Sequence, residues 1–275
     1  MNLNGLEYHL ETDGHGSPLL MLHGFMGSSD SWSSIRRGLA ERFQLLMPDL
    51  VGHGQTAFTP ELTRYDMSSV GHDLALLMGD APFNLLGYSM GGRLALYFAI
   101  HYPHLIRKLI IISGSPGLAN ADQRMARRQA DDALADRMDA QSIEQVVAEW
   151  ERLPLWQSST FSQLAQAQLR AVRLAQNPRG LALSLRGMGT GVQPPLWEQL
   201  HQVSMPTLLM VGEQDTKFVQ IAHQMMEHLP HASLEIIPNV GHSVSIEAPQ
   251  LTLASVVRFL EDDRGGECSS EHSPR

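Results

Sequence analysis

The 275-residue sequence lacks the features that mark secreted, membrane-spanning or disulfide-stabilised proteins. Its one cysteine, Cys268, has no partner for an internal disulfide. No apolar run approaches the ~20 residues that a membrane-spanning helix needs. Residues 1–8 hold neither the basic nor the apolar region of a secretory signal. We therefore expect a cytoplasmic protein without a membrane span.

Basic residues are also scarce, and almost all of them are arginine. The formal net charge is −9, with 18 Arg and 2 Lys in the whole chain. An acidic chain of this kind binds nucleic acid poorly, so we expect no nucleic-acid partner. Residues 117–200 differ from the rest, because nine Arg there balance nine Asp and Glu. If the ligand is an anion, these arginines are its expected contacts.

Motifs for a bound metal or nucleotide cofactor are missing as well. The sequence has no zinc-binding spacing, P-loop or Rossmann fingerprint. We expect no metal and no cofactor. The expected partner is a small molecule, and the expected state is a monomer or weak homodimer.

Short apolar runs alternate with helical patterns over most of the chain. This rhythm predicts an α/β fold with a mostly parallel, eight-stranded sheet flanked by helices. One edge strand is expected over Leu3–Thr12. The rhythm stops between residues 117 and 200, where every segment favours helix. We expect residues 1–116 and 201–261 to form the core, 117–200 an all-helical lid over the sheet edge where ligands bind, and 262–275 a disordered tail.

One stretch combines a strand, a sharp turn and a helix around a lone serine. Gly87-Tyr88-Ser89-Met90-Gly91 fits the G-x-S-x-G nucleophile elbow, in which the serine hydroxyl stands above the sheet at a helix N-terminus. Five-residue patterns also occur by chance, so an ordinary strand-to-helix loop is the alternative. Candidate residues elsewhere in the chain are needed to distinguish these two interpretations.

Further candidates follow other predicted strands. Asp215 and His242 succeed Ser89 in the order Ser, Asp, His, which is the order of the α/β-hydrolase triad. Alone, Asp215 could form a turn and His242 could cap a helix, but together with the elbow they favour a catalytic triad. The loop after the strand at residues 19–22 could aim the Phe25 N–H at an oxyanion, with the Met90 N–H as its partner.

These motifs resemble the α/β-hydrolase superfamily over residues 3–260. The helical segment resembles a narrower group, the MenH family, whose members are 2-succinyl-6-hydroxy-2,4-cyclohexadiene-1-carboxylate (SHCHC) synthases. The stretches that carry this second resemblance are Gly114–Arg124 with Arg127 and Arg128, Arg93, Val147–Trp150, Arg173, Gly187–Pro194 and Asp215–Phe218.

The resemblance implies a lyase that eliminates pyruvate from a cyclohexene tricarboxylate in menaquinone biosynthesis, without a cofactor. It implies that Ser89, activated by His242 and Asp215, abstracts a proton. The residues that it implies bind substrate are Tyr88, Arg93, Arg127, Trp150 and Arg173. Because Arg127 and Arg128 adjoin, the sequence leaves open which of the two faces the pocket.

Two other functions stay open at this point. A serine hydrolase, either a carboxylesterase or a C–C bond hydrolase, would use the same triad and form an acyl-enzyme on Ser89. A non-catalytic ligand receptor could also occupy this scaffold, although the complete triad disfavours it. The arginines could be solvated or paired with acids, and Trp150 could simply pack inside the lid.

Overall fold

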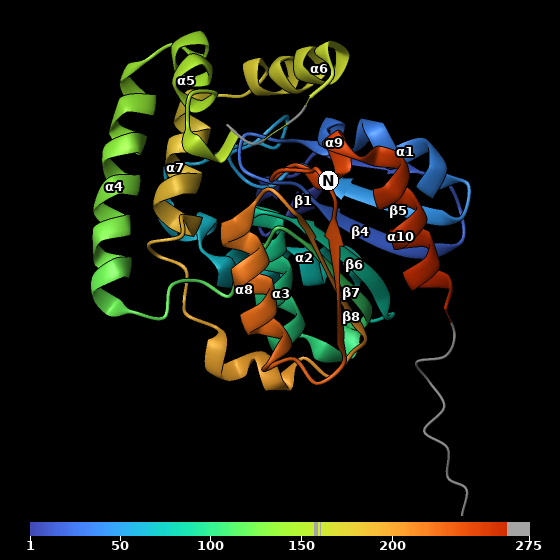
Figure 1. Ribbon diagram of the computed structural model, residues 1–275. Helices are drawn as coiled ribbons and strands as arrows, with labels where there is room; N and C mark the ends of the chain where they lie inside the picture. Colours follow the sequence, from blue (N-terminus) through green and yellow to red (C-terminus); the bar gives the residue numbers. More distant parts are fainter. Residues whose placement is uncertain (157–158, 160, 263–275) are drawn as a thin grey trace, which may run out of the picture.

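The computed structural model describes residues 1–156, 159 and 161–262, and a twisted, mostly parallel sheet lies at its centre (Figure 1). Within these residues the sheet has seven strands in the order β3-β5-β4-β6-β7-β8-β9. Only β3 runs antiparallel to its neighbour. The strands are β3 (Leu10–Asp13), β4 (Ser17–Leu22), β5 (Phe43–Pro48), β6 (Phe83–Tyr88), β7 (Ile106–Ile112), β8 (Thr207–Gly212) and β9 (Ala232–Ile237).

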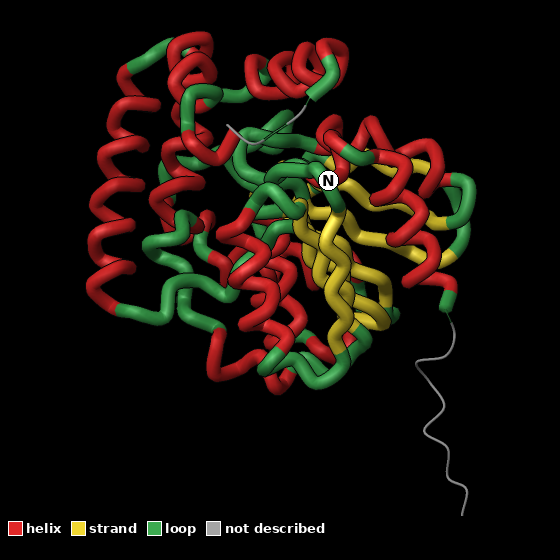
Figure 2. The backbone as a smooth tube through the Cα atoms, in the orientation of Figure 1, coloured by secondary structure: helices red, strands yellow, loops and turns green. Residues whose placement is uncertain are grey.

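Helices cover both faces of the sheet, as Figure 2 shows. On one face lie α1 (Ser33–Ala40) and α10 (Pro249–Glu261), and on the other α2 (Met67–Met78), α3 (Met90–His101) and α8 (Thr216–Met226). Alternate residues of a strand face opposite sides of the sheet, so the apolar residues of β4 contribute to two hydrophobic cores. Leu19 and Met21 pack with α1, whereas Leu20 and Leu22 pack with α3. A strand buried on both faces is what a continuous apolar run predicts.

The N-terminal segment differs from the expected single edge strand. Asn4 and Gly5 have positive φ angles of 49° and 82°, which turn the chain back on itself. Two short strands, β1 (Asn2–Leu3) and β2 (Leu6–Glu7), therefore pair with each other in a separate two-stranded sheet. The expected strand over Leu3–Thr12 is wrong in this respect, and so is the count of eight strands in the main sheet.

Between β7 and β8 the described residues form four α-helices. They are α4 (Ala121–Ala140), α5 (Ile143–Trp150), α6 (Gln163–Leu174) and α7 (Pro178–Met188). Figure 1 shows α4 and α7 side by side, away from the sheet. They share an apolar cluster that includes Ala135, Met138, Leu181 and Leu185. The all-helical character expected for this segment is confirmed for its described residues, while the division into core and lid stays a prediction.

Short helical turns complete the described part of the chain. They are η1 (Ser29–Trp32), η2 (Leu62–Tyr65), η3 (Pro103–Leu105), η4 (Pro154–Trp156), η5 (Trp197–Gln202) and α9 (Val244–Glu247). Among the described helices, none is both long enough and apolar enough to cross a bilayer. The expected disordered tail, apart from Asp262, lies outside the described residues.

Candidate active site

Ser89 stands at a strained turn between β6 and α3. Its φ and ψ angles are 51° and −108°, a region that residues with a Cβ rarely adopt. The surrounding chain leaves no space for side chains beside it, since a Cβ at Gly91 would lie 2.0 Å from the carbonyl oxygen of Leu22. A Cβ at Gly87 would likewise lie 2.3 Å from the Gly91 carbonyl oxygen. The glycines of the elbow are thus required by close backbone packing.

The fold brings Ser89, His242 and Asp215 into one hydrogen-bonded row. The Nε2 atom of His242 lies 3.0 Å from the Ser89 Oγ, and its Nδ1 atom lies 2.6 Å from an oxygen of Asp215. Asp215 directly follows the loop after β8, and His242 comes from the loop after β9. Both side chains are almost fully buried. This geometry lets His242 take the serine proton while Asp215 holds the imidazole ring.

Phe25 and Met90 are the residues whose backbone N–H groups the sequence analysis assigns to an oxyanion hole. Met90 is the first residue of α3, so its N–H has no acceptor within the helix. Phe25 follows β4 and precedes Met26, whose φ angle is 60°. Both residues line the same cavity as Ser89. The Phe25 ring packs against Trp150 at 5.2 Å and against His53 at 5.4 Å between ring centroids.

His23 has a structural role, because its ring is hydrogen-bonded to the backbone next to this loop. Its Nε2 accepts a hydrogen bond from the Leu50 N–H at 2.9 Å, and its Nδ1 lies 2.8 Å from the Gly24 carbonyl oxygen. This pattern requires the neutral tautomer with the proton on Nδ1. Burial lowers the pKa of His23 and keeps the ring neutral.

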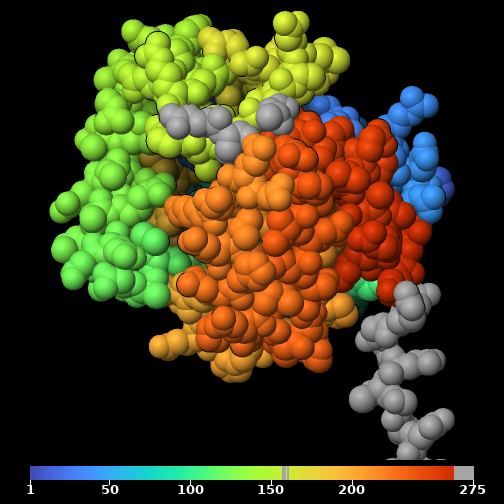
Figure 3. Space-filling model, viewed as in Figure 1, coloured from blue at the N-terminus to red at the C-terminus, as the bar shows by residue number. Residues whose placement is uncertain are grey.

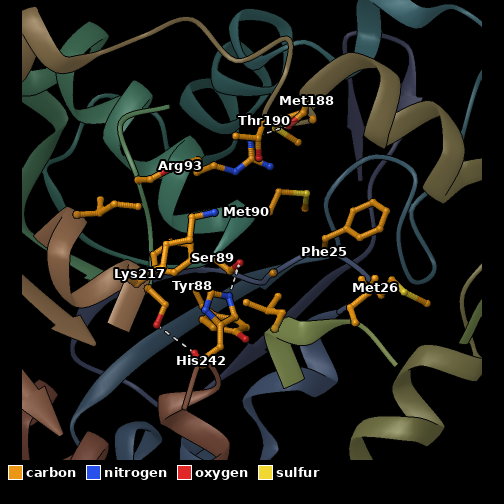
Figure 4. A pocket seen from close by; sticks show the side chains of 18 of the residues that line it. Phe25, Met26, Tyr88, Ser89, Met90, Arg93, Met188, Thr190, Lys217 and His242 are labelled. Atoms are coloured by element: carbon orange, nitrogen blue, oxygen red, sulfur yellow. Dashed lines mark hydrogen bonds between the residues drawn. The ribbon is translucent and has the colours of Figure 1, made fainter. Parts of the chain in front are cut away.

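A cavity of about 960 Å³ opens in front of Ser89, between the sheet and the helical segment. In Figure 3 the surface is hollowed between the green segment of α4 and the orange segment of α8. Figure 4 shows side chains from several elements around it. Every predicted site residue except Asp215, which stands behind His242, lines this cavity: Phe25, Tyr88, Ser89, Met90, Arg93, Arg127, Trp150, Arg173 and His242.

Within the described residues, the arginines that line the cavity are Arg93, Arg127, Arg137 and Arg173, and Arg93 is the most unusual of them. It projects from α3 and donates to the Met188 carbonyl oxygen at 2.8 Å and to the Gln193 side-chain oxygen at 3.1 Å. No acidic side chain of the described chain forms an ion pair with it. Burial, followed by the positive charge of Arg127, lowers its pKa to about 10. Arg93 is therefore a cation whose counter-charge is incomplete.

The structure distinguishes Arg127 from its neighbour on α4. Arg127 lines the cavity, and its Nε donates to Asp131 at 2.7 Å. The Arg128 side chain is 65% exposed and lies 3.8 Å from Asp132. Both pairs have the same i,i+4 spacing, so the rotation of α4 against the rest of the protein makes the difference. Arg127 is the one that faces the pocket.

Arg173 comes from α6 and is almost fully buried. Its guanidinium lies 4.5 Å from the centre of the Trp156 ring and 3.3 Å from Glu151, which also pairs with Arg170. Burial lowers the pKa of Arg173, and the negative charge of Glu151 partly offsets this effect. The sequence analysis named neither acid partner. Asp131 follows Arg127 by four residues on α4, so this spacing could have indicated the pair. The pairing of Glu151 with Arg173 depends on tertiary packing.

Tyr88 forms part of the wall beside the triad. Its hydroxyl and the Ser243 Oγ share a hydrogen bond of 2.9 Å, and its ring centroid lies 5.6 Å from that of His242. Burial raises the pKa of the phenol, which keeps it neutral. Because the hydroxyl is engaged by Ser243, the ring is the part of Tyr88 that shapes the pocket.

Other residues of the cavity escaped the sequence analysis. Trp156 meets His242 edge-on at 6.0 Å, and its indole N–H has no partner among the described residues. Lys217 also lines the cavity, two residues after Asp215. The position of Lys217 after a strand could have drawn attention to it. No local pattern distinguishes Trp156 from a packing residue. In the described part of the chain, no cluster of three or more His, Cys, Asp and Glu side chains could hold a metal ion.

Comparison with known proteins agrees with this geometry. The alpha/beta hydrolase fold family matches residues 17–249. A Bacillus subtilis (strain 168) protein, named provisionally for 2-succinyl-6-hydroxy-2,4-cyclohexadiene-1-carboxylate synthase, is 37% identical, with 94% of this chain and 96% of that protein covered. The synthase of that name from Serratia proteamaculans (strain 568) is 32% identical, with 88% and 92% covered.

A solved structure is similar over nearly the whole length of both chains. The structure of MenH from S. aureus superposes with a TM-score of 0.89 at 34% identity, with 94% of this chain and 98% of that chain covered. The match includes the helical segment as well as the sheet, since so little of either chain is left out. This chain therefore belongs to the α/β-hydrolase fold family and, within it, to the MenH family of SHCHC synthases.

Proposed function

We propose that this protein eliminates pyruvate from 2-succinyl-5-enolpyruvyl-6-hydroxy-3-cyclohexene-1-carboxylate to give 2-succinyl-6-hydroxy-2,4-cyclohexadiene-1-carboxylate. The observation that carries the proposal is that Arg93, Arg127 and Arg173, together with Arg137, line the cavity that opens onto Ser89. The substrate has three carboxylates, and the forked guanidinium group suits each of them. A pocket for a neutral ester would have no use for such a cluster.

The triad would supply the base for this elimination. Ser89, having passed its proton to His242, would take the ring proton on the carbon next to the succinyl carbonyl. The electron pair of that C–H bond moves onto the carbonyl oxygen, where the N–H groups of Phe25 and Met90 would stabilise it. As the enolate collapses, the ring double bond shifts, a second one forms, and the C–O bond to the enolpyruvyl group breaks. The departing enolate of pyruvate would then take up the proton that His242 received from Ser89, which would restore the triad.

The helical segment would act as a lid that completes the site. Arg127 and Arg173 come from α4 and α6, whereas Arg93 and the triad come from the sheet and its flanking elements. A tricarboxylate held across this boundary would draw the two parts together and exclude water. Trp150 and Tyr88 would provide apolar walls. We place this reaction in the cytoplasm, on a monomer or weak homodimer that needs no metal or cofactor.

Pyruvate release is the direct test. It is followed with lactate dehydrogenase on freshly prepared substrate, and the spontaneous rate in buffer is subtracted. We expect wild type to exceed that rate by orders of magnitude and Ser89→Ala to approach it. Ser184→Ala is the matched control, because the Ser184 Oγ also lines the cavity but contacts the Met90 sulfur at 3.9 Å. Its rate should stay within about twofold of wild type.

The serine hydrolase alternative predicts the opposite pattern. It requires no acceleration of pyruvate release, together with a burst of p-nitrophenol from p-nitrophenyl butyrate as an acyl-enzyme forms on Ser89. Wild-type pyruvate release no faster than buffer would refute the synthase proposal.

A further inference from the structure

The loop that carries His242 is held by one carboxylate from both sides. Glu247 accepts a hydrogen bond from the Gly241 N–H at 2.9 Å and another from the Ser243 N–H at 3.0 Å, each through a different oxygen. These two N–H groups belong to the residues immediately before and after His242. The carboxylate therefore brackets the histidine without touching its ring.

The other contacts of this loop are weaker or lie to one side. The hydroxyl of Ser113 donates to the His242 carbonyl oxygen at 3.0 Å, and the Ser243 hydroxyl meets that of Tyr88. Asp215 holds the ring at Nδ1, and the rings of Tyr88, Trp156 and Phe218 pack around it, so the backbone of the loop sets how far the imidazole reaches toward Ser89. A hydrogen bond to a charged acceptor is about twice as strong as a neutral one. Glu247 thus supplies the two strongest backbone anchors beside His242.

We propose that Glu247 is a positioning residue that fixes the distance between the His242 Nε2 atom and the Ser89 Oγ atom. The Nε2 to Oγ distance of 3.0 Å is suited to proton transfer. A displacement of about 1 Å at such a contact can reduce the rate about a hundredfold. Glu247 acts on this distance through the backbone on both sides of the histidine, not through the substrate. The inference rests on the proposed function only for the assay of pyruvate release.

Glu213, in the loop after β8, provides a matched control because its carboxylate contacts the loop that carries His242. Its carboxylate accepts a hydrogen bond from the Asn239 N–H at 2.9 Å, three residues before His242. Replacing Glu213 by Gln changes the same kind of contact without disturbing the neighbours of the histidine. The test set is Glu247→Gln, Glu247→Ala and Glu213→Gln in the full chain, with the melting temperature of each variant measured alongside.

Two assays test this proposal, and one of them does not depend on the identity of the natural substrate. The first is pyruvate release. The second is the rate at which a fluorophosphonate modifies Ser89, in which Oγ bonds to phosphorus, fluoride leaves and the serine proton passes to His242. The second rate depends on the Ser89–His242 pair whatever the natural substrate is. If wild type reacts with the probe but releases no pyruvate, the proposed function fails and this inference is still tested.

We expect Glu247→Gln, which keeps one acceptor oxygen, to lower kcat and the probe rate about tenfold, and Glu247→Ala about a hundredfold. KM should stay within about twofold, because the carboxylate does not face the ligand. Glu213→Gln should match wild type in both assays. The inference is overturned if Glu247→Gln, folded by its melting curve, loses no more activity than Glu213→Gln, or if KM rises while kcat is kept.

Discussion

Replacing Arg93 by Met would test the charge that the pocket leaves incomplete. Methionine has a similar length and no charge, so Arg93→Met keeps most of the packing beside Met188 and Gln193 while it removes the cation. Within the described residues this cation has two neutral acceptors and no ion-pair partner, and the charge of Asp131 offsets the effect of burial only in part. A substrate carboxylate would supply the missing counter-charge. We therefore expect the variant to bind and process the tricarboxylate poorly.

The pKa of Arg93 gives the size of this effect. Its fall from 12.5 to about 10 means that the folded protein disfavours the charged form by about 3 kcal/mol. A bound carboxylate that removes this cost would contribute about as much to binding, so its loss should reduce kcat/KM about a hundredfold. The free-energy cost of keeping Arg93 charged is constant at every pH well below about 10. The ratio of the wild-type kcat/KM to that of the variant should therefore not change between pH 6 and 8.5.

Three assays check the reasoning. Pyruvate release gives kcat/KM, fluorophosphonate labelling of Ser89 gives the state of the triad without any carboxylate, and urea unfolding gives stability. Arg128→Met is the matched control, since this exposed neighbour of Arg127 pairs only with Asp132 across 3.8 Å. Labelling by Arg93→Met should stay within about twofold of wild type. An equal loss in both reactions, or a loss in pyruvate release no larger than that of Arg128→Met, would refute the argument.

Three further variants follow from the same contacts. Asp215→Asn should lower kcat by about 10³-fold or more with little change in KM, because an amide favours the wrong tautomer of His242; steady-state pyruvate release checks this. Asp131→Ala should lower the free energy of unfolding in urea by about 2 kcal/mol, because Arg127 loses its partner. Burial lowers the pKa of His53 well below 6.5, so only the unfolded chain takes up its proton, and stability falls as the pH drops below about 6.5; His53→Gln should make that fall shallower in urea titrations at pH 7 and 5.

Much of the fold could be predicted because the pattern is local. The run that became β4 is apolar at every position from Leu19 to Leu22, which only a strand buried on both faces accommodates. The helix α4 lies within residues 117–200, the part of the chain expected to be helical, and Asn120 caps its first turn. The N-terminal strand could not be predicted in the same way. Its apolar positions suit a strand, and the turn at Asn4 and Gly5 decides which partner each piece pairs with.

The residues of the candidate site could likewise be predicted only in part from the sequence. Asp215 and His242 each follow a strand of one parallel sheet, so the order of the chain was enough to bring them near Ser89. The choice between Arg127 and Arg128 was not available from the sequence, since each has an Asp four residues later. Trp156 could not be identified for a related reason, because its edge-on contact with His242 joins residues that are far apart in the sequence.

The acid partners of the arginines explain how such a pocket can remain folded without a ligand. Among the described residues, Arg93, Arg127, Arg137 and Arg173 line one partly buried cavity, where their guanidinium groups would repel one another and lose hydration. Arg137 pairs with Glu149 at 3.5 Å. Asp131 and Glu151 offset two of the others, which leaves Arg93 as the group that gains most when a carboxylate arrives. A ligand with one carboxylate would meet Arg93 alone, whereas a tricarboxylate must also compete with the two acids. Selectivity for the tricarboxylate then depends on how easily Arg127 and Arg173 exchange Asp131 and Glu151 for carboxylates of the substrate. Both arginines lie on helices of the segment between β7 and β8.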